Sequence, residues 1–476
     1  DISTSEDYYF GFYDYNARYW DNIARNAPYY LIVKAAGNDR GEGPSTQPVE
    51  HWVWINGQWV LQTVARELDG GTTGYDCVSH QAVAKNVLTV GAVNDIPNGY
   101  TQPSDVVMST FSSWGPTDDG RIKPDVVANG VSLYSATASS NSAYGTMSGT
   151  SMAAPNASGS LGLLLQQHRN LYGDNPLLAS TLKAVIIHTA DEAGTSAGPD
   201  YKFGWGLMNT LKAVQLMQEN FERGGSHIYE LALTQGSQME FQVSSTGYEP
   251  LRATICWTDP AGTPPQPSLD PPTPMLVNDI DLRLIGPNST TYFPYILDPG
   301  NPSAAATTGD NIRDNVEQVH IQSPIAGLYT VRISHKGTLT AGSQQVSLII
   351  TGNSDIQVTV DQKLEDGITS VGNVGHWEGG PDFVLYPVPE KFPFPEGSNQ
   401  VFQATQEIIS GQKYNRWNEE ENVVNHHLFT IHPGLTKLIS NFKSTHSGAV
   451  LKNELICAPG QDGGTIEFKD PWLIDY

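Results

Sequence analysis

The sequence has few basic residues for its length. Lysine and arginine together number 26, against 50 aspartates and glutamates, which leaves a formal net charge of -24. A chain of this charge lacks the cationic surface that nucleic acids require, so nucleic acid is a poor partner. The excess of acidic residues has two interpretations, which are a solubilising surface and a set of carboxylates that binds calcium.

Cysteine and long apolar runs are also scarce. Only three cysteines occur, Cys77, Cys256 and Cys457, and their wide spacing indicates neither a disulfide framework nor a zinc site. We expect each to behave as a small buried hydrophobic residue. No stretch approaches the roughly 18 apolar residues of a membrane span. The opening DISTSEDYYF lacks both the basic start and the apolar core of a signal peptide.

The composition indicates a globular protein with more than one domain. The chain has 476 residues, of which 39% are hydrophobic and only 16% charged. A chain this long exceeds one ordinary core. Residues 1–222 alternate helical and apolar strand patterns, which predicts an α/β domain with a mainly parallel sheet. An insertion at residues 39–76 contains WVWINGQWV, in which Asn56-Gly57 predicts a β-hairpin.

Helical patterns disappear after the segment ERGGSH at residues 222–227, which we interpret as a linker. Residues 228–353 contain short alternating strands between turns, and this pattern predicts a β-sandwich or jelly roll. Residues 355–476 predict a further β-rich module without a catalytic motif. That module is either a surface-attachment or recruiting unit or a spacer. Its tryptophans could bind carbohydrate or peptide or could form core: Trp377, Trp417 and Trp472.

The stretch GTMSGTSMAAPNASG, residues 145–159, places Ser151 directly before a helical pattern with an apolar face. We expect Ser151 at the helix N-terminus and Pro155 in the first turn, where proline is tolerated. Free N–H groups and the helix dipole would then stabilise a developing oxyanion beside Ser151. The alternative is that Ser151 only caps the helix.

The motif GTSMAAP resembles the nucleophile motif of the subtilisin-like serine proteases, or subtilases. Further segments resemble the family in its order, and together they cover about residues 8–220: VKAAGN (33–38), AKNVLTVGAV (84–93), FSSWGPT (111–117), KPDVVANGVSLYSAT (123–137) and FGWGLMN (203–209). The resemblance implies a three-layer subtilisin-like domain with Ser151 as nucleophile and Asn38 as oxyanion donor. It also implies substrate-binding residues: Ala35, Ala36, Gly37, Gly149 and Thr150. Asn156 departs from the family's usual residues.

A larger departure concerns the other two residues of the catalytic triad. Subtilases carry the aspartate and the histidine before the serine, and the resemblance places both before the oxyanion asparagine. No histidine precedes Asn38 in this chain, since His51 and His80 both follow it. A neutral serine needs a general base within hydrogen-bond reach. We therefore expect the chain alone to be inactive apart from a residual acceleration of about 10³–10⁴ over water.

Two interpretations of the absent base remain open. In the first, the protein is a secreted or cell-surface serine endopeptidase that forms an acyl-enzyme on Ser151 with a protein or peptide substrate. Its aspartate and histidine then come from an N-terminal part of the same protein that is not in this chain. In the second, the chain is an inactive pseudoprotease that presents a peptide- or protein-binding surface. The presence of both Ser151 and Asn38 favours the first.

The β domain carries a candidate calcium site. MLVNDIDLRLIGPNST, DNVEQVHI and GLYTVRI resemble the jelly-roll domain of some subtilases, which is related in character to the P-domain of proprotein convertases and often holds calcium. Asp279 and Asp281 alternate along a predicted strand and so share one face. Asp310, Asp314 and Asn315 lie in a polar loop that offers more oxygen ligands. The alternative is a solvated turn beside ordinary acidic residues.

Overall fold

The computed structural model describes residues 7–353 and five later strand segments. These segments are β18 (Ile356–Gln357), β19 (His426–Thr430), β20 (Lys437–Lys443), β21 (Val450–Ala458) and β22 (Thr465–Lys469). Strands β19 to β22 form an antiparallel sheet in the order β19-β22-β21-β20. The predictions for the rest of residues 355–476, including the three tryptophans, lie outside the described residues. Within the described part, no helix combines the length and apolar character of a membrane span.

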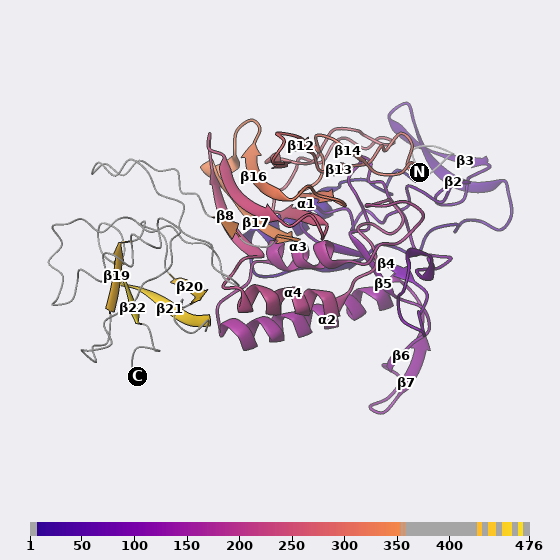
Figure 1. Cartoon of the computed structure of the whole chain (residues 1–476). Coiled ribbons are helices and arrows are strands. Elements are labelled where there is room, and N and C mark those ends of the chain that lie inside the picture. Colours follow the sequence, from indigo (N-terminus) through magenta and orange to yellow (C-terminus); the bar gives the residue numbers. More distant parts are fainter. Residues whose placement is uncertain are drawn as a thin grey trace, which may run out of the picture.

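A parallel sheet and its helices form the first part of the molecule (Figure 1). The sheet has the order β1-β4-β5, and its strands are β1 (Val33–Ala35), β4 (Leu88–Val93) and β5 (Val126–Asn129). Every residue of β4 is buried, as expected for a parallel strand covered on both faces. The long helix α2 (Thr150–Tyr172) packs against all three strands, and α4 (Thr210–Glu222) lies beside α2. The prediction of an α/β domain with a parallel sheet is confirmed.

Helix α1 (Tyr15–Asn26) begins at a strong N-terminal cap. The Asp14 side chain accepts hydrogen bonds from the backbone N–H groups of Asn16 and Ala17. Within the helix, Asp21 is completely buried and accepts from the Tyr13 hydroxyl at 2.7 Å and from the Asn86 N–H at 2.9 Å. These bonds hold α1 to the turn that precedes β4.

The predicted hairpin in the insertion is confirmed. Strands β2 (Val49–Ile55) and β3 (Gln58–Val64) pair around Asn56-Gly57. Both turn residues have positive φ angles, 50° and 82°, which is the reason that the Asn-Gly pair favours this turn. Val53 is buried on one face of the hairpin, whereas Trp54 and Trp59 are exposed on the other and contact each other edge to face.

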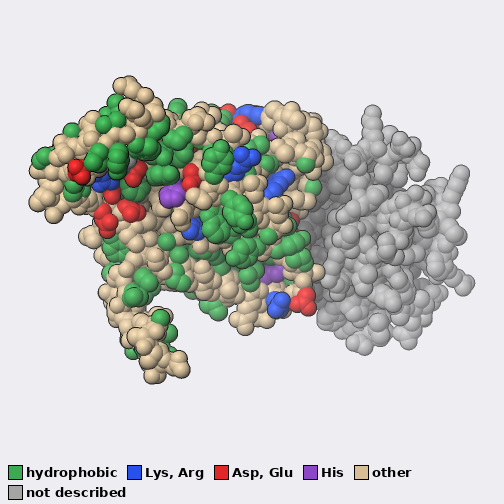
Figure 2. Space-filling model, turned by 180° about the vertical axis from the view of Figure 1, so that it is seen from behind, with side chains coloured by type: hydrophobic (Ala, Val, Ile, Leu, Met, Phe, Trp, Pro, Cys, Tyr) green, Lys and Arg blue, Asp and Glu red, His purple; other side chains and the backbone are tan. Residues whose placement is uncertain are grey.

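The strand that follows β5 does not join the parallel sheet. Strand β6 (Leu133–Ala136) pairs antiparallel with β7 (Tyr144–Met147) in a two-stranded ribbon. This ribbon projects from the body in both views (Figures 1 and 2). The residues of both strands are half-buried or exposed. Such a sequence lacks the continuous apolar run of a strand that is covered on both faces.

Two antiparallel sheets follow the α/β part. The first has the order β15-β10-β17-β8, and the second has the order β12-β11-β16-β9-β18. The bounds of their strands are β8 Ile228–Thr234, β9 Met239–Ser245, β10 Leu251–Cys256, β11 Ile280–Ile285, β12 Thr291–Tyr292, β15 Val316–Ile321, β16 Gly327–His335 and β17 Ser343–Thr351. A small ribbon joins β13 (Tyr295–Ile296) to β14 (Thr307–Thr308). Side chains of both larger sheets share one hydrophobic core. The jelly-roll topology stays a prediction.

The two parts are joined by a buried contact as well as by the connecting residues 222–227, of which residues 222–224 are exposed, and the linker interpretation stays a prediction. Ser226 and His227 are buried, and the His227 N–H donates to Asn220 at 2.8 Å. Helix α3 (Ala179–Thr189) is buried over its whole length. It packs against β10 and β17 of the β domain. The core of the α/β part consequently extends into the first antiparallel sheet.

Basic side chains are sparse on the described face in Figure 2, in keeping with the composition. The three-residue 3₁₀ turns Pro103–Asp105 and Thr340–Gly342 complete the regular structure of the first 353 residues.

Cys77 and Cys256 are both buried and free, as expected for small hydrophobic residues.

Buried histidines at this contact predict acid sensitivity. His188 lies between the hydroxyls of Thr254 and Thr351, each at 2.8 Å. Burial lowers the pKa of His188 well below its usual value and that of His320 to about 4. Because the unfolded histidines have a pKa near 6.5, the unfolded state binds more protons between about pH 6.5 and 4. The contribution of these neutral histidines to the free energy of unfolding is therefore complete above pH 6.5 and is lost as the pH falls toward 4.

Thermal unfolding between pH 7 and pH 4 measures this effect. His320 alone should contribute on the order of 2 kcal/mol of destabilisation, after allowance for its partial exposure to solvent. His320→Gln should make the melting temperature less dependent on pH, while His80→Gln, at a half-buried position beside Tyr9, should leave the dependence as it is. An identical pH dependence in wild type and His320→Gln would contradict this prediction.

Candidate functional site

The candidate site lies at the N-terminus of α2. Gly149 is the N-terminal cap residue and contributes no side-chain hydrogen bond, while Ser151 is the second residue of the helix. The alternative that Ser151 only caps the helix is therefore wrong. Ser151 is exposed to solvent. Pro155 is the sixth helical residue, not part of the first turn as predicted, and its missing N–H leaves the Ser151 carbonyl without the usual i+4 donor.

Gly149 keeps the space beside Ser151 open. Its φ angle of 154° and its place at the turn into α2 favour glycine. A Cβ atom on Gly149 would lie 3.6 Å from Asn38 Nδ2 and 3.6 Å from the Ser151 backbone nitrogen. These two nitrogen donors thus border one small space. The Ser151 N–H belongs to the first turn, whose N–H groups have no partner within a helix.

Hydrogen bonds from Thr150 fix the orientation of the Asn38 carboxamide. Asn38 Oδ1 accepts from the Thr150 N–H at 2.8 Å and from the Thr150 hydroxyl at 2.9 Å. A backbone N–H can only donate, so the amide oxygen must face Thr150. The Nδ2 donor is consequently directed away from Thr150 and borders the space beside Gly149. Sequence reasoning placed Thr150 among the substrate-binding residues and missed this positioning role.

The segment that ends β1 is held rigidly. The Ala36 N–H donates to Val90 at 3.0 Å, and its carbonyl accepts from Ser79 at 3.0 Å. Gly37 has a φ angle of 121°, and a Cβ there would lie 2.7 Å from the Ser113 hydroxyl. The Ser113 N–H also donates to the Gly37 carbonyl at 3.0 Å. Asn38 is therefore presented from a backbone that has little freedom to move.

Burial corrects part of the predicted substrate-binding set. Ala36 and Thr150 are completely buried, and the backbone polar groups of Ala36 are both occupied. A substrate cannot reach either residue, so both position the site instead of binding substrate. Gly149 is also buried, whereas Ala35, Gly37 and Asn38 are half-buried. The predicted roles of Ala35, Gly37 and Gly149 in substrate binding stay predictions, as does the role of Asn38 as oxyanion donor.

No histidine of residues 7–353 contacts Ser151. His188, His227 and His320 lie at the contact with the β domain. The other four make their contacts elsewhere: His51 with the Val49 carbonyl, His80 with the Tyr9 ring, His168 with the Tyr172 ring and His335 with the Gly236 N–H. The source of a general base for Ser151 stays a prediction.

The five predicted calcium ligands do not share one set of partners. Asp279, Asp281 and Asp310 surround the ammonium group of Lys336. Asp314 is buried and accepts from the Ile122 N–H at 2.8 Å. Asn315 donates to the Trp257 carbonyl at 2.7 Å. Asp314 and Asn315 thus form hydrogen bonds at the contact between the α/β part and the β domain.

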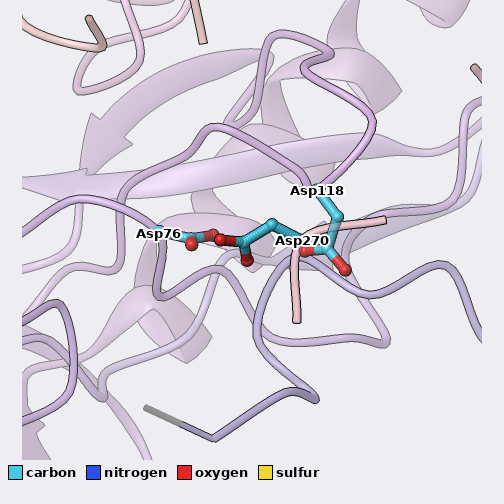
Figure 3. A group of neighbouring side chains, drawn as sticks. All are labelled: Asp76, Asp118 and Asp270. Atoms are coloured by element: carbon cyan, nitrogen blue, oxygen red, sulfur yellow. The ribbon is translucent and has the colours of Figure 1, made fainter. Parts of the chain in front are cut away.

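A different acidic cluster has the spacing of metal ligands. One carboxylate oxygen each from Asp76, Asp118 and Asp270 lies within 4.8 Å of the others (Figure 3). Asp76 and Asp118 are half-buried, and Asp270 is exposed in the proline-rich segment of residues 260–274. Acidic groups at this spacing are common without a metal. We therefore assign no metal site to this cluster.

Comparisons with known proteins agree with the motifs at this site. Residues 10–206 match the model of the subtilase family, Peptidase_S8. The chain is 37% identical over 147 residues to serine protease AprX of Bacillus subtilis (strain 168), which covers 28% of this chain and 31% of AprX. It is 24% identical over 401 residues to the serine protease/ABC transporter B family protein tagA of Dictyostelium discoideum, which covers 66% of this chain and 21% of tagA.

Among solved structures, the patellamide maturation protease PatA is 23% identical, with a TM-score of 0.30. That alignment covers 44% of this chain and 58% of PatA, and the score is too low to bear on the fold. The chain spans less than a third of the length of the two curated relatives.

Proposed function

We propose that this chain carries the nucleophile and the oxyanion hole of a subtilisin-like serine endopeptidase. The family match of residues 10–206 and the relatives named serine proteases support this proposal. The observation that carries the finer proposal is the pair of hydrogen bonds from Thr150 to Asn38 Oδ1. This pair leaves Asn38 Nδ2 and the Ser151 N–H as two donors beside Gly149.

In the proposed reaction, Ser151 Oγ attacks the carbonyl carbon of the scissile peptide and its proton passes to a histidine base. The carbonyl oxygen gains negative charge and is held by the Ser151 N–H and Asn38 Nδ2. Collapse of the tetrahedral intermediate breaks the C–N bond, and the leaving amine takes the proton from the histidine. Water then hydrolyses the acyl-enzyme with the same histidine as base.

The proposed base comes from an N-terminal part of the same protein that docks on this face. In the described sheet, β1 pairs only with β4 and so leaves one edge open. Along α2, Leu163 is 58% exposed. A Cβ on Gly159 or Gly162 would meet nothing within 4 Å. A strand paired to β1 and a helix packed on this side of α2 would cover both features and bring the histidine and aspartate to Ser151.

A second candidate function is an inactive peptide-binding module. It is favoured by one observation, which is that none of the seven histidines in residues 7–353 contacts Ser151. For either function we propose a secreted or cell-surface location, because the composition is rich in glycine and poor in charged residues. The proposed substrate is a protein or peptide.

Labelling with a fluorophosphonate separates the two functions. The test uses the full-length protein that contains this chain, with peptide mapping to establish that any N-terminal part is present. We expect a covalent adduct on Ser151 in the wild type, because adduct formation requires an activating base. Ser148→Ala should label like the wild type, whereas Ser151→Ala should not label.

An unlabelled wild type, in material that maps as complete, would reject the peptidase and favour the binding module. Label on another residue in Ser151→Ala would reject the assignment of the nucleophile.

A further inference from the structure

Three carboxylates of the β domain converge on one ammonium group. Lys336 Nζ lies 2.8 Å from Asp281 Oδ1, 2.8 Å from Asp310 Oδ1 and 3.3 Å from Asp279 Oδ2. Asp279 and Asp281 lie at the start of β11, and Lys336 follows directly after β16, the antiparallel partner of β11. The Lys336 N–H donates to the Asp279 carbonyl at 2.9 Å, which fixes the base of the side chain.

A second cation binds two of these three acids. Arg283 NH2 lies 2.9 Å from Asp281 Oδ1 and 2.6 Å from Asp310 Oδ1. The Arg283 guanidinium also stacks over the ring of Phe293, 4.7 Å from its centroid. Lys336 and Arg283 thus bind the same two carboxylate oxygens from different elements. Arg283 follows Asp281 by two residues on the same strand face, a spacing visible in the sequence, whereas nothing in the sequence placed Lys336 there.

A fourth carboxyl group borders the cluster with one oxygen unused. Glu317 is completely buried on β15, and its Oε2 accepts from the Leu282 N–H at 2.6 Å. Its Oε1 has no hydrogen-bond partner among the described residues, and neither has Asp279 Oδ1. Burial raises the pKa of Glu317 well above its usual value, and the neighbouring Asp281 raises it further. The carboxyl of Glu317 thus lies beside Asp281 with one oxygen that accepts no hydrogen bond from any described residue.

The three acids have the chemistry of a calcium site, but the ammonium group occupies its centre. Calcium binds carboxylate oxygens at 2.3–2.6 Å, and it would have to approach the same oxygens that Lys336 and Arg283 already contact. The two positive charges of a calcium ion would lie beside the charges of Lys336 and Arg283, which repel it. The residues therefore do not fit a calcium ion while Lys336 keeps its position.

We propose that Lys336 is an internal cation that replaces a divalent ion between Asp279, Asp281 and Asp310, and that loss of its ammonium group opens a calcium site. The β domain then needs no metal at this position to hold β11, β16 and the loop of Asp310 together. Without the ammonium, Arg283 remains on Asp281 and Asp310, but the three acids keep an excess of negative charge, and the unused oxygens of Asp279 and Glu317 are available as the hard oxygen ligands that calcium requires. This inference is independent of the peptidase proposal.

The test compares wild type, Lys336→Met and Lys336→Arg in the full-length protein. Thermal unfolding is followed in excess EGTA and in millimolar calcium, and calcium binding is counted by titration calorimetry. Lys336→Met should melt several degrees below the wild type in EGTA, because three carboxylates lose their cation. It should recover in calcium and should bind one more calcium ion per chain than the wild type. Lys336→Arg keeps the charge and should respond to calcium as the wild type does.

A second variant shows whether the additional ion binds at this cluster. Lys336→Met combined with Asp310→Asn should lose the additional calcium ion, because one of the three carboxylates is gone. Equal calcium binding and equal calcium response in wild type and Lys336→Met would overturn the proposal. It would also be overturned if Asp310→Asn alone abolished a calcium effect seen in the wild type, since calcium would then displace Lys336. Should Lys336→Met not fold, Lys336→Gln is read in the same way.

Discussion

Replacement of Asn38 by aspartate should lower kcat for peptide hydrolysis about 10²–10³-fold, with KM changed by no more than a few-fold. The size of the effect is the one known for subtilisin when its oxyanion asparagine is removed. Aspartate keeps an oxygen that can accept both hydrogen bonds from Thr150 but has no Nδ2 donor. The loss is confined to kcat because the oxyanion carries its charge only in the transition state and the intermediate.

The measurement is steady-state hydrolysis of a chromogenic peptide by the active full-length protein. Asn156→Ala is the matched control, since Asn156 is an exposed asparagine on α2 whose side chain donates to the Asn129 carbonyl. It should stay near wild-type activity. If Asn38→Asp lost less than tenfold in kcat, or lost activity through KM alone, Asn38 would not be the oxyanion donor. Labelling of Ser151 by the fluorophosphonate tests the nucleophile and does not depend on the role of Asn38.

Replacement of Asp259 by alanine should destabilise the protein by about 3–5 kcal/mol, the cost of leaving a buried charge without its partner. Asp259 pairs with Lys85 across the joint between the β domain and the α/β part, and both side chains are completely buried. The ammonium of Lys85 would retain only two carbonyl partners, those of Pro260 at 2.6 Å and Met275 at 2.7 Å. The same carboxylate also accepts from the Asn278 N–H at 2.8 Å.

Thermal unfolding of the full-length protein measures this loss. The control is Arg332→Ala, which breaks the ion pair with Glu240, where both side chains are about two-fifths exposed. Exposed pairs contribute about 0–1 kcal/mol, so the melting temperature should hardly change. Asp259→Ala combined with Lys85→Met should regain part of the stability, because no charge is left unpaired. A loss in Asp259→Ala no greater than in Arg332→Ala would show that the joint does not depend on this pair.

Taken together, the contacts at the joint explain why the α/β part and the β domain should unfold as one unit. Helix α3 is buried between them, and Asp314 accepts from the Ile122 N–H of the α/β part. Sequence reasoning interpreted residues 222–227 as a linker and could not report the contact that the end of this segment makes. The burial of His227 depends on β17, more than a hundred residues away, and no local pattern reports it.

The sequence by itself determined the features that depend on neighbouring residues. The helix that follows Ser151 and the hairpin at Asn56-Gly57 follow from residue periodicity and turn chemistry, which act within a few residues. The roles of Ser151 and Asn38 come from several ordered motifs of a family and not from physical chemistry alone, and they stay predictions.

Only the tertiary structure decided the features that join distant segments. Thr150 orients Asn38 from 112 positions away, and β6 pairs with β7 instead of joining the parallel sheet. Lys336 reaches Asp281 across a strand pair and meets Asp310 from a separate loop. The sequence indicated which carboxylates could bind a cation. Strand pairing decided that this cation is Lys336, because the strength of a charge interaction depends on the distance between the groups and not on their separation in sequence.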